Sequence, residues 1–142
     1  MWMPDVNVLV AASVAQAPYH GRARDAMENA FRGPSRVGFA WAALTGFVRI
    51  TTRRGVFERP LGVEQALQVV DNWLHHPAAV IAHPGPGHQG LLGRLLLAAG
   101  AAGNLTTDAH LAAIAIEHGA VLGSFDRDFD RFAGLRFEHL KP

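Results

Sequence analysis

The chain has 142 residues, the usual length of one domain, and we expect a single domain over residues 1–142. Hydrophobic residues make up 49% of the chain and charged residues 18%, a composition that excludes a disordered protein. The 13 basic and 12 acidic residues give a net charge of +1, which excludes a polybasic or polyacidic protein. The chain has no cysteine, so any bound metal must use oxygen or imidazole ligands.

The sequence predicts neither a signal peptide nor a membrane span. Residues 1–4 hold no basic segment followed by a long apolar stretch, and Asp5 and Asn7 interrupt the next apolar residues. No apolar run approaches the ~18 residues that a membrane-spanning helix needs. We therefore expect a cytoplasmic protein that does not contact the membrane.

Apolar periodicity predicts that strands and helices alternate in the first half of the chain. Strands are expected at residues 1–6 and 36–40, and helices at residues 7–15, 17–32 and 41–52. Residues 53–61 form an expected loop, and the pattern then predicts a helix at residues 62–75, before Pro77.

The second half continues the alternation. It begins with a strand at residues 78–82, a loop rich in glycine and proline at residues 83–90 and a buried helix at residues 91–99. Thr106 and Thr107 predict the N-cap of a helix through Ile116, and Gly119 predicts its left-handed cap. Strands at residues 120–125 and 135–137 complete the pattern. The alternation indicates an α/β fold, a three-layer α/β/α sandwich with a short, mainly parallel sheet.

Three aspartates fall where such a sheet binds ligands. Asp5 ends the first strand, Asp108 lies in the first turn of a helix, and Asp126 directly follows a strand. Carboxylates that converge at one sheet edge repel one another unless a cation neutralises them. Mg²⁺ prefers oxygen ligands, and Mn²⁺ commonly replaces it, so the pattern predicts a divalent metal site.

A purely structural interpretation stays open for two of these acids. Asp108 could stabilise a helix start and Asp126 could begin a turn, as isolated aspartates commonly do. Asp5 lies among apolar residues, where a carboxylate has to be neutralised or paired. We interpret Asp130, in the charged stretch of residues 126–130, as part of a solvated turn.

Three motifs, in this order, resemble the PIN-domain ribonucleases of the VapC toxin type. They are DVNVL at residues 5–9, TDAHLAAIA at residues 107–115 and LGSFDRDF at residues 122–129. The resemblance implies a small α/β/α domain that hydrolyses RNA with Mg²⁺ or Mn²⁺. It also implies a homodimer and a VapB-type antitoxin as the partner.

The same resemblance implies roles for individual residues. Asp5, Asp108 and Asp126 would be the catalytic and metal-binding acids. The polar supports would be Asn7 and Ser124, with Asp128 as an outer acid.

The sequence departs from the pattern of the family that it resembles at Gly46, where the family usually has a glutamate. No carboxylate lies between Glu28 and Glu58. Residues 46–52, GFVRITT, resemble a stretch found in a subgroup of these toxins. We expect three acids and water to hold the metal; the alternative is a PIN-like module that binds RNA or protein without efficient catalysis.

A basic cluster lies just beyond position 46 in the sequence. Arg49, Arg53, Arg54 and Arg59 suit the binding of RNA phosphates, because guanidinium groups bind phosphate oxygens bidentately. A solvated basic loop is an equally good interpretation, and an acidic segment of an antitoxin could use the same surface.

Other motifs predict competing functions that we consider weaker. Residues 85–90 match G-x-G-x-x-G, but Pro86 stiffens the loop and Asp108 begins a helix instead of ending a strand. Lys141, near the C-terminus, is the only lysine, which argues against a Walker motif and against phosphatases that use a lysine. Eight histidines include no H-E-x-x-H pair, and we expect those at positions 75, 76 and 118 to cap helices. His88 opens a helix and has no expected role.

Overall fold

Five parallel strands form one sheet in the computed structural model, which describes residues 1–141. Pro142, the last residue of the expected domain, lies outside the described residues. The strand order is β3-β2-β1-β4-β5, and every pairing is parallel. The strands are β1 (Trp2–Pro4), β2 (Val37–Phe39), β3 (Ala79–Ile81), β4 (Val121–Ser124) and β5 (Arg136–His139).

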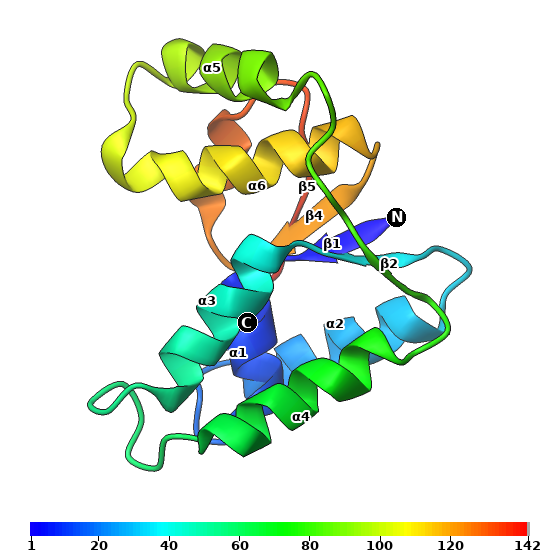
Figure 1. Cartoon of the computed structure of the whole chain (residues 1–142), viewed down its shortest axis with the longest axis vertical. Helices are drawn as coiled ribbons and strands as arrows, with labels where there is room; N and C mark the ends of the chain where they lie inside the picture. Colours follow the sequence, from blue (N-terminus) through cyan, green and yellow to red (C-terminus); the bar gives the residue numbers. More distant parts are fainter. Residues whose placement is uncertain (142) are drawn as a thin grey trace.

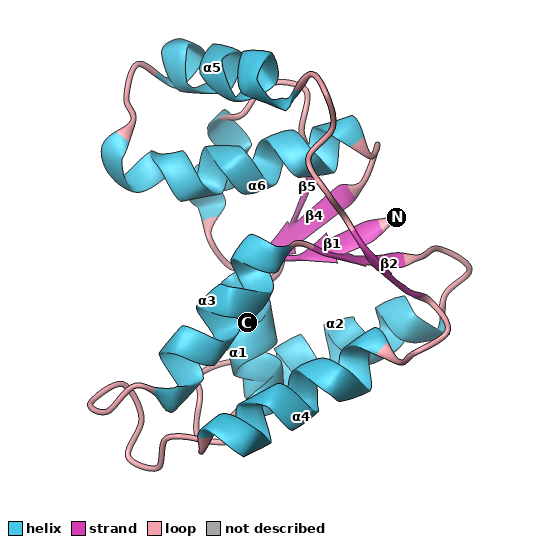
Figure 2. Ribbon diagram, in the orientation of Figure 1, coloured by secondary structure: helices cyan, strands magenta, loops and turns pink. Residues whose placement is uncertain are grey.

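Helices cover both faces of this sheet (Figures 1 and 2). One layer holds α1 (Val6–Ser13), α2 (His20–Arg32), α3 (Trp41–Thr52) and α4 (Val63–Leu74). The other holds α5 (His88–Ala99) and α6 (Thr106–Glu117). The expected three-layer α/β/α sandwich with a parallel sheet is therefore confirmed.

Alternation along the strands produces two separate cores. Val37 and Phe39, two residues apart on β2, both pack into the core under α1–α4. Met3 of β1 and Leu122 of β4 pack into the core under α5 and α6. Both sets are fully buried, as expected for strands covered on two faces.

Helix α2 begins later than the sequence predicts. The expected start was residue 17, but the helix begins at His20, after Tyr19 in a left-handed conformation with φ 65° and ψ 19°. A chain in that conformation cannot continue a right-handed helix, so the turn at Tyr19 sets the boundary.

The expectation that residues 91–99 form a buried helix is wrong. Helix α5 begins at His88, and only Leu95 within it is buried, while Leu97 is 84% exposed. Helix α5 is largely exposed because it packs on α6, at the outside of its layer, and not on the sheet (Figure 1).

The ends of α6 and of the last strand also correct the prediction. Thr106 is the first residue of α6, the N-cap position is Leu105, and no side chain caps the helix there. A short 3₁₀ turn, η1 (Gly103–Leu105), leads directly into α6 and leaves no room for a threonine cap. The left-handed Gly119 is confirmed, with φ 62°. Strand β5 extends to His139, two residues further than expected.

None of the helices within residues 1–141 has the length and apolar character needed to cross a membrane.

Candidate active site

Asp5 lies at the carboxyl end of β1, in the middle of the sheet. It is the N-cap of α1, and its Oδ1 accepts a hydrogen bond of 2.7 Å from the backbone N–H of Val6. The residue is 6% exposed. Burial raises the pKa of the Asp5 carboxyl, and the hydrogen bonds from Ser124 and Val6 oppose that rise.

Ser124 connects the ends of the two central strands. Its hydroxyl donates to Oδ2 of Asp5 at 2.7 Å and accepts from Nδ2 of Asn7 at 3.0 Å. The backbone N–H of Asp126 also donates to this hydroxyl, at 3.0 Å. The two residues interpreted as polar supports thus fix Asp5 and the chain at Asp126 relative to each other.

Asp126 begins the 3₁₀ helix η2 (Arg127–Arg131). Its Oδ1 accepts a hydrogen bond of 2.9 Å from the backbone N–H of Asp128, in the manner of an N-cap. Asp128 is exposed and lies 3.3 Å from the guanidinium of Arg131. Asp130 is exposed as well, as its interpretation as a solvated turn residue requires.

Asp108 lies in the first turn of α6 and feels the negative charges of the other acids. Its pKa is raised to about 6, first by burial and then by the negative charges of Asp5, Asp126 and Asp128. Arg131 is the one group that lowers it. The structure therefore brings the three predicted acids within electrostatic reach of one another, although they lie 103 and 18 residues apart in the sequence.

The donor set fits a hard divalent cation, since it consists of carboxylate oxygens whose mutual repulsion a cation would relieve. Asp108 accepts no hydrogen bond within residues 1–141, so its carboxylate depends on water or a ligand. As the side chains stand, however, no three His, Asp or Glu residues in the described part converge closely enough to hold an ion.

Gly46 faces this end of α1 from α3. A Cβ at position 46 would lie 3.0 Å from Cγ2 of Val6, the residue after Asp5. Helix α3 thus passes close to the residue after Asp5, but it brings no carboxylate of its own to the acids.

The four arginines of the basic cluster are exposed at and beyond the end of α3. Arg49 lies beside an apolar hollow between α3 and α4, and the loop that follows α3 carries the other three. None of these arginines forms an ion pair with a carboxylate among residues 1–141. Their charges are therefore available to an anionic ligand.

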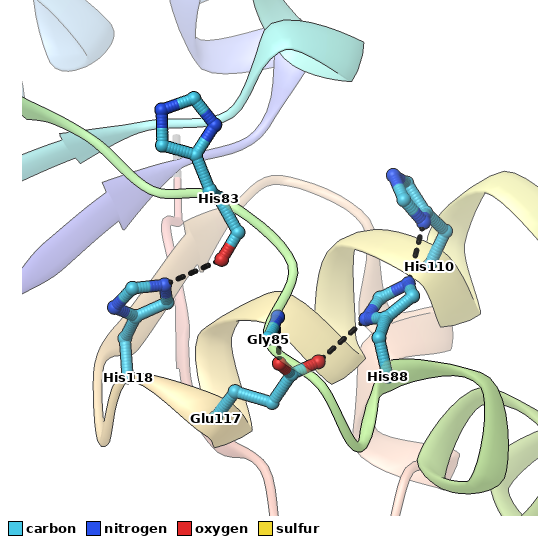
Figure 3. Close-up of polar contacts among 6 residues, drawn as sticks. All are labelled: His83, Gly85, His88, His110, Glu117 and His118. Carbon is cyan, nitrogen blue, oxygen red and sulfur yellow. Dashed lines mark hydrogen bonds and ion pairs between the residues drawn. The ribbon is translucent and has the colours of Figure 1, made fainter.

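A second polar cluster, which the sequence patterns did not predict, joins α5 to α6 (Figure 3). The Glu117 carboxylate lies 2.5 Å from Nδ1 of His88 and accepts a hydrogen bond from the backbone N–H of Gly85. Nε2 of His88 in turn contacts Nδ1 of His110 at 2.8 Å. Burial lowers the pKa of His110, the neighbouring His88 lowers it further, and Glu117 opposes both.

One signal could have indicated this cluster. His110 and Glu117 are seven residues apart, which puts them on the same face of α6. Of the three histidines expected to cap helices, one contacts its own helix and two contact other segments. His75 contacts the Asp71 carbonyl in the last turn of its own helix, whereas His76 accepts from the backbone N–H of Ala78 and His118 contacts the His83 carbonyl of another segment.

The fold and the acidic end of the sheet define the class of protein: an α/β/α domain with carboxylates gathered at the ends of the central strands. The family model of the PIN domain matches residues 3–135. The chain belongs to the PIN-domain family, and it is similar to curated VapC ribonucleases.

Two curated relatives show the extent of the similarity. Ribonuclease VapC37 of Mycobacterium tuberculosis is 43% identical over 138 residues, which cover 97% of this chain and 96% of the relative. Ribonuclease VapC33 of the same species is 39% identical over 137 residues, with 96% of each chain covered.

Solved structures share the fold at lower identity. VapC20 of M. tuberculosis, described as a toxin that cleaves the sarcin-ricin loop, matches with a TM-score of 0.71 at 17% identity, over 96% of this chain and 99% of that one. VapBC2 of Rickettsia felis, bound to promoter DNA, matches with a TM-score of 0.70 at 19% identity over 96% of both chains. The expected PIN-like fold is thus confirmed from both sequence and structure.

Proposed function

We propose that this protein is a metal-dependent endoribonuclease and the toxin of a type II toxin–antitoxin pair. Similarity to VapC ribonucleases over nearly the whole chain supports the class of reaction. The observation that carries the proposal for the site is Asp108, whose pKa is raised to about 6 by burial and by three neighbouring aspartates. Such a concentration of negative charge is suited to a cation.

Asp5, Asp108 and Asp126 would hold Mg²⁺, or Mn²⁺ in its place. When bound, the ion would lower the pKa of a water molecule and stabilise the negative charge that grows on the phosphoryl oxygens. Ser124 holds the Asp5 carboxylate in a fixed orientation through its hydroxyl. Asn7 keeps that hydroxyl directed at Asp5 by donating to its oxygen.

Substrate binding falls to the basic cluster. Arg49, Arg53 and Arg54 are exposed and would bind RNA phosphates. In-line attack of water on a phosphodiester would leave a 5′-phosphate and a 3′-hydroxyl. The resemblance to VapC toxins implies two partners. One is a VapB-type antitoxin, as in the R. felis VapBC2 complex. The other is a second copy of the chain in a homodimer.

One observation favours the alternative, a PIN-like binding module without efficient catalysis. Position 46 is a glycine, and α3 contains no acid that could replace the missing carboxylate. Catalysis would then depend on three acids.

Cleavage of a fluorescent RNA pool by the purified protein separates the two functions. We expect cleavage with added Mg²⁺ or Mn²⁺ and none in EDTA. Asp5→Asn, Asp108→Asn and Asp126→Asn should each abolish it, and Asp130→Asn, an exposed acid of the same stretch, is the matched control. RNA binding without cleavage at any metal concentration would support the binding module instead.

A further inference from the structure

An apolar hollow of about 320 Å³ opens beside the acidic site. Its walls come from α1, the segment before α2, the end of α3, the loop after α3, and Phe125. Asn7, which holds Ser124 against Asp5, lines the hollow, and Phe125 directly precedes Asp126. The hollow and the acids therefore share one wall.

Tyr19 forms the outer rim of the hollow, in an unusual conformation. Among residues 1–141 it is the only residue other than glycine with a positive φ, which is sterically unfavourable for a bulky side chain. Its ring stacks on Phe125, with the centroids 5.2 Å apart, yet the residue is 49% exposed. Residues held in strained backbone conformations cluster at active sites and ligand-binding sites.

The loop after α3 joins the hollow to the basic cluster. It contributes Phe57 to the wall, and it also carries Arg53, Arg54 and Arg59. Nε2 of Gln16 donates to the carbonyl of Arg59 at 3.2 Å and so ties this loop to the segment before α2. The apolar wall thus includes residues next to the acids, Asn7 and Phe125, and a residue of the positive loop, Phe57.

We propose that the hollow receives one unpaired nucleobase of the RNA substrate, with Tyr19 as the platform on which the base stacks. The proposal rests on the proposed function. Single-stranded RNA is recognised by stacking its bases on aromatic side chains while basic groups bind the backbone. A base in the hollow would place its neighbouring phosphates between the arginines and the acids. The positive loop, with its unpaired guanidinium groups, favours a polyanion over an apolar peptide as the occupant.

Binding without cleavage tests this proposal directly. The probe is a fluorescent 12-nucleotide oligoadenylate in EDTA, with the dissociation constant measured by anisotropy. We expect Tyr19→Gly to weaken binding by roughly tenfold, in keeping with the usual effect of losing one stacked base, and Tyr19→Phe to bind like the parent. Glycine accepts a positive φ, so Tyr19→Gly removes the ring without adding strain.

Two controls make the result specific. Leu97 is 84% exposed and lies on α5, in the other helical layer, so Leu97→Ala should leave RNA binding unchanged. The second control is a series of oligonucleotides that each carry one abasic site, at a different position in each. The parent protein should bind one member of the series more weakly than the others. That position-specific loss should disappear in Tyr19→Gly.

The outcomes separate this proposal from the proposed function. Binding that depends on Tyr19, with no cleavage of any RNA in Mg²⁺, would support the hollow and contradict the ribonuclease. No measurable binding by the parent, or equal affinities of the parent and Tyr19→Gly, would overturn the nucleobase site. A Tyr19→Gly protein that keeps its RNA affinity but no longer co-purifies with the antitoxin encoded beside it would also overturn it, because the hollow would then bind protein.

Discussion

Two polar clusters of this protein contain buried or half-buried carboxylates, and they differ in what neutralises them. At the ends of the central strands, Asp108 is surrounded by three other aspartates, with Arg131 as the one opposing charge. Between α5 and α6, Glu117 is satisfied by the His88 ring and by a backbone N–H (Figure 3).

This difference separates an acid that stabilises the fold from acids that do not. Glu117 has protein partners for both carboxylate oxygens, so its bonds contribute to the docking of α5. The acids at the sheet edge destabilise one another in the folded chain, a cost that a bound cation would remove. We therefore expect substitutions in the first cluster to change activity and substitutions in the second to change stability.

The largest effect should come from Asp126→Asn. This substitution keeps the shape of the side chain, and its amide oxygen can still accept from the Asp128 N–H, but it removes one charge from the acidic cluster. We expect RNA cleavage to fall by about 100-fold or more, the usual effect of losing an electrostatic contribution to catalysis. Initial rates in saturating Mg²⁺ measure it.

Glu117→Gln serves as the comparison in the same assay, and its cleavage rate should stay within about twofold of the parent. Equal losses in the two variants would show that the clusters do not differ in the way proposed.

The free energy of unfolding should change most in the variant whose cleavage rate changes least. Glu117→Gln exchanges a half-buried, hydrogen-bonded carboxylate for an amide beside His88, and we expect the free energy of unfolding to fall by about 2 kcal/mol. Urea denaturation followed by circular dichroism measures the change. The matched control is Asp71→Asn, which removes an exposed acid–histidine pair on α4 and should cost less than about 0.5 kcal/mol.

Asp108→Asn should stabilise the metal-free protein at neutral pH. The pKa of Asp108 is about 6 in the folded chain against an ordinary 3.8, so the folded form binds a proton more tightly and loses stability as the pH rises between these values. Above pH 6 the asparagine variant should be more stable by about 1–2 kcal/mol, a figure reduced for the partial exposure of the side chain.

Below pH 4 that advantage should vanish, because the aspartate is then protonated in both states. Thermal unfolding in EDTA across pH 4–8 tests the trend, and a stability difference that does not depend on pH would contradict it. Added Mg²⁺ should reverse the order at pH 7 by stabilising the parent alone.

Local sequence patterns predicted the layers and the acidic cluster. Apolar periodicity located the strands and most helices, because burial on two faces fixes which residues are apolar. The acids were predictable since parallel strands present their carboxyl ends at one edge, so that residues following β1 and β4 meet there. The structure supplied the order of the strands, which explains why Asp5 and Ser124 are direct neighbours.

Features that depend on contacts distant in the sequence escaped prediction. His88 is 29 residues from Glu117 and 22 from His110, and no local pattern indicates that α5 lies on α6. The hollow next to the acids is a similar case, since Tyr19, Phe57 and Phe125 come from three separate segments. The left-handed conformation of Tyr19 is not predictable from the sequence, because a bulky residue rarely adopts it.

The smallest effect should come from Gly46→Glu, which returns a carboxylate to the position where the family usually has one. A side chain at this point in α3 gains about 0.5–1 kcal/mol of helix propensity over glycine. Its Cβ, however, would lie 3.0 Å from Cγ2 of Val6, so α1 must shift by a few tenths of an ångström. Because the two effects oppose each other, we expect the free energy of unfolding to change by less than about 1 kcal/mol.

Cleavage by Gly46→Glu should equal or exceed that of the parent protein. The control is Gly46→Gln, which has the same shape and adds no charge to the acidic cluster. If glutamine raised the rate as much as glutamate, the gain would come from packing against Val6. If both variants lost cleavage while remaining folded, the contact between α3 and α1 would be needed to hold Asp5 in place, and the acidic site would extend to the helix that carries position 46.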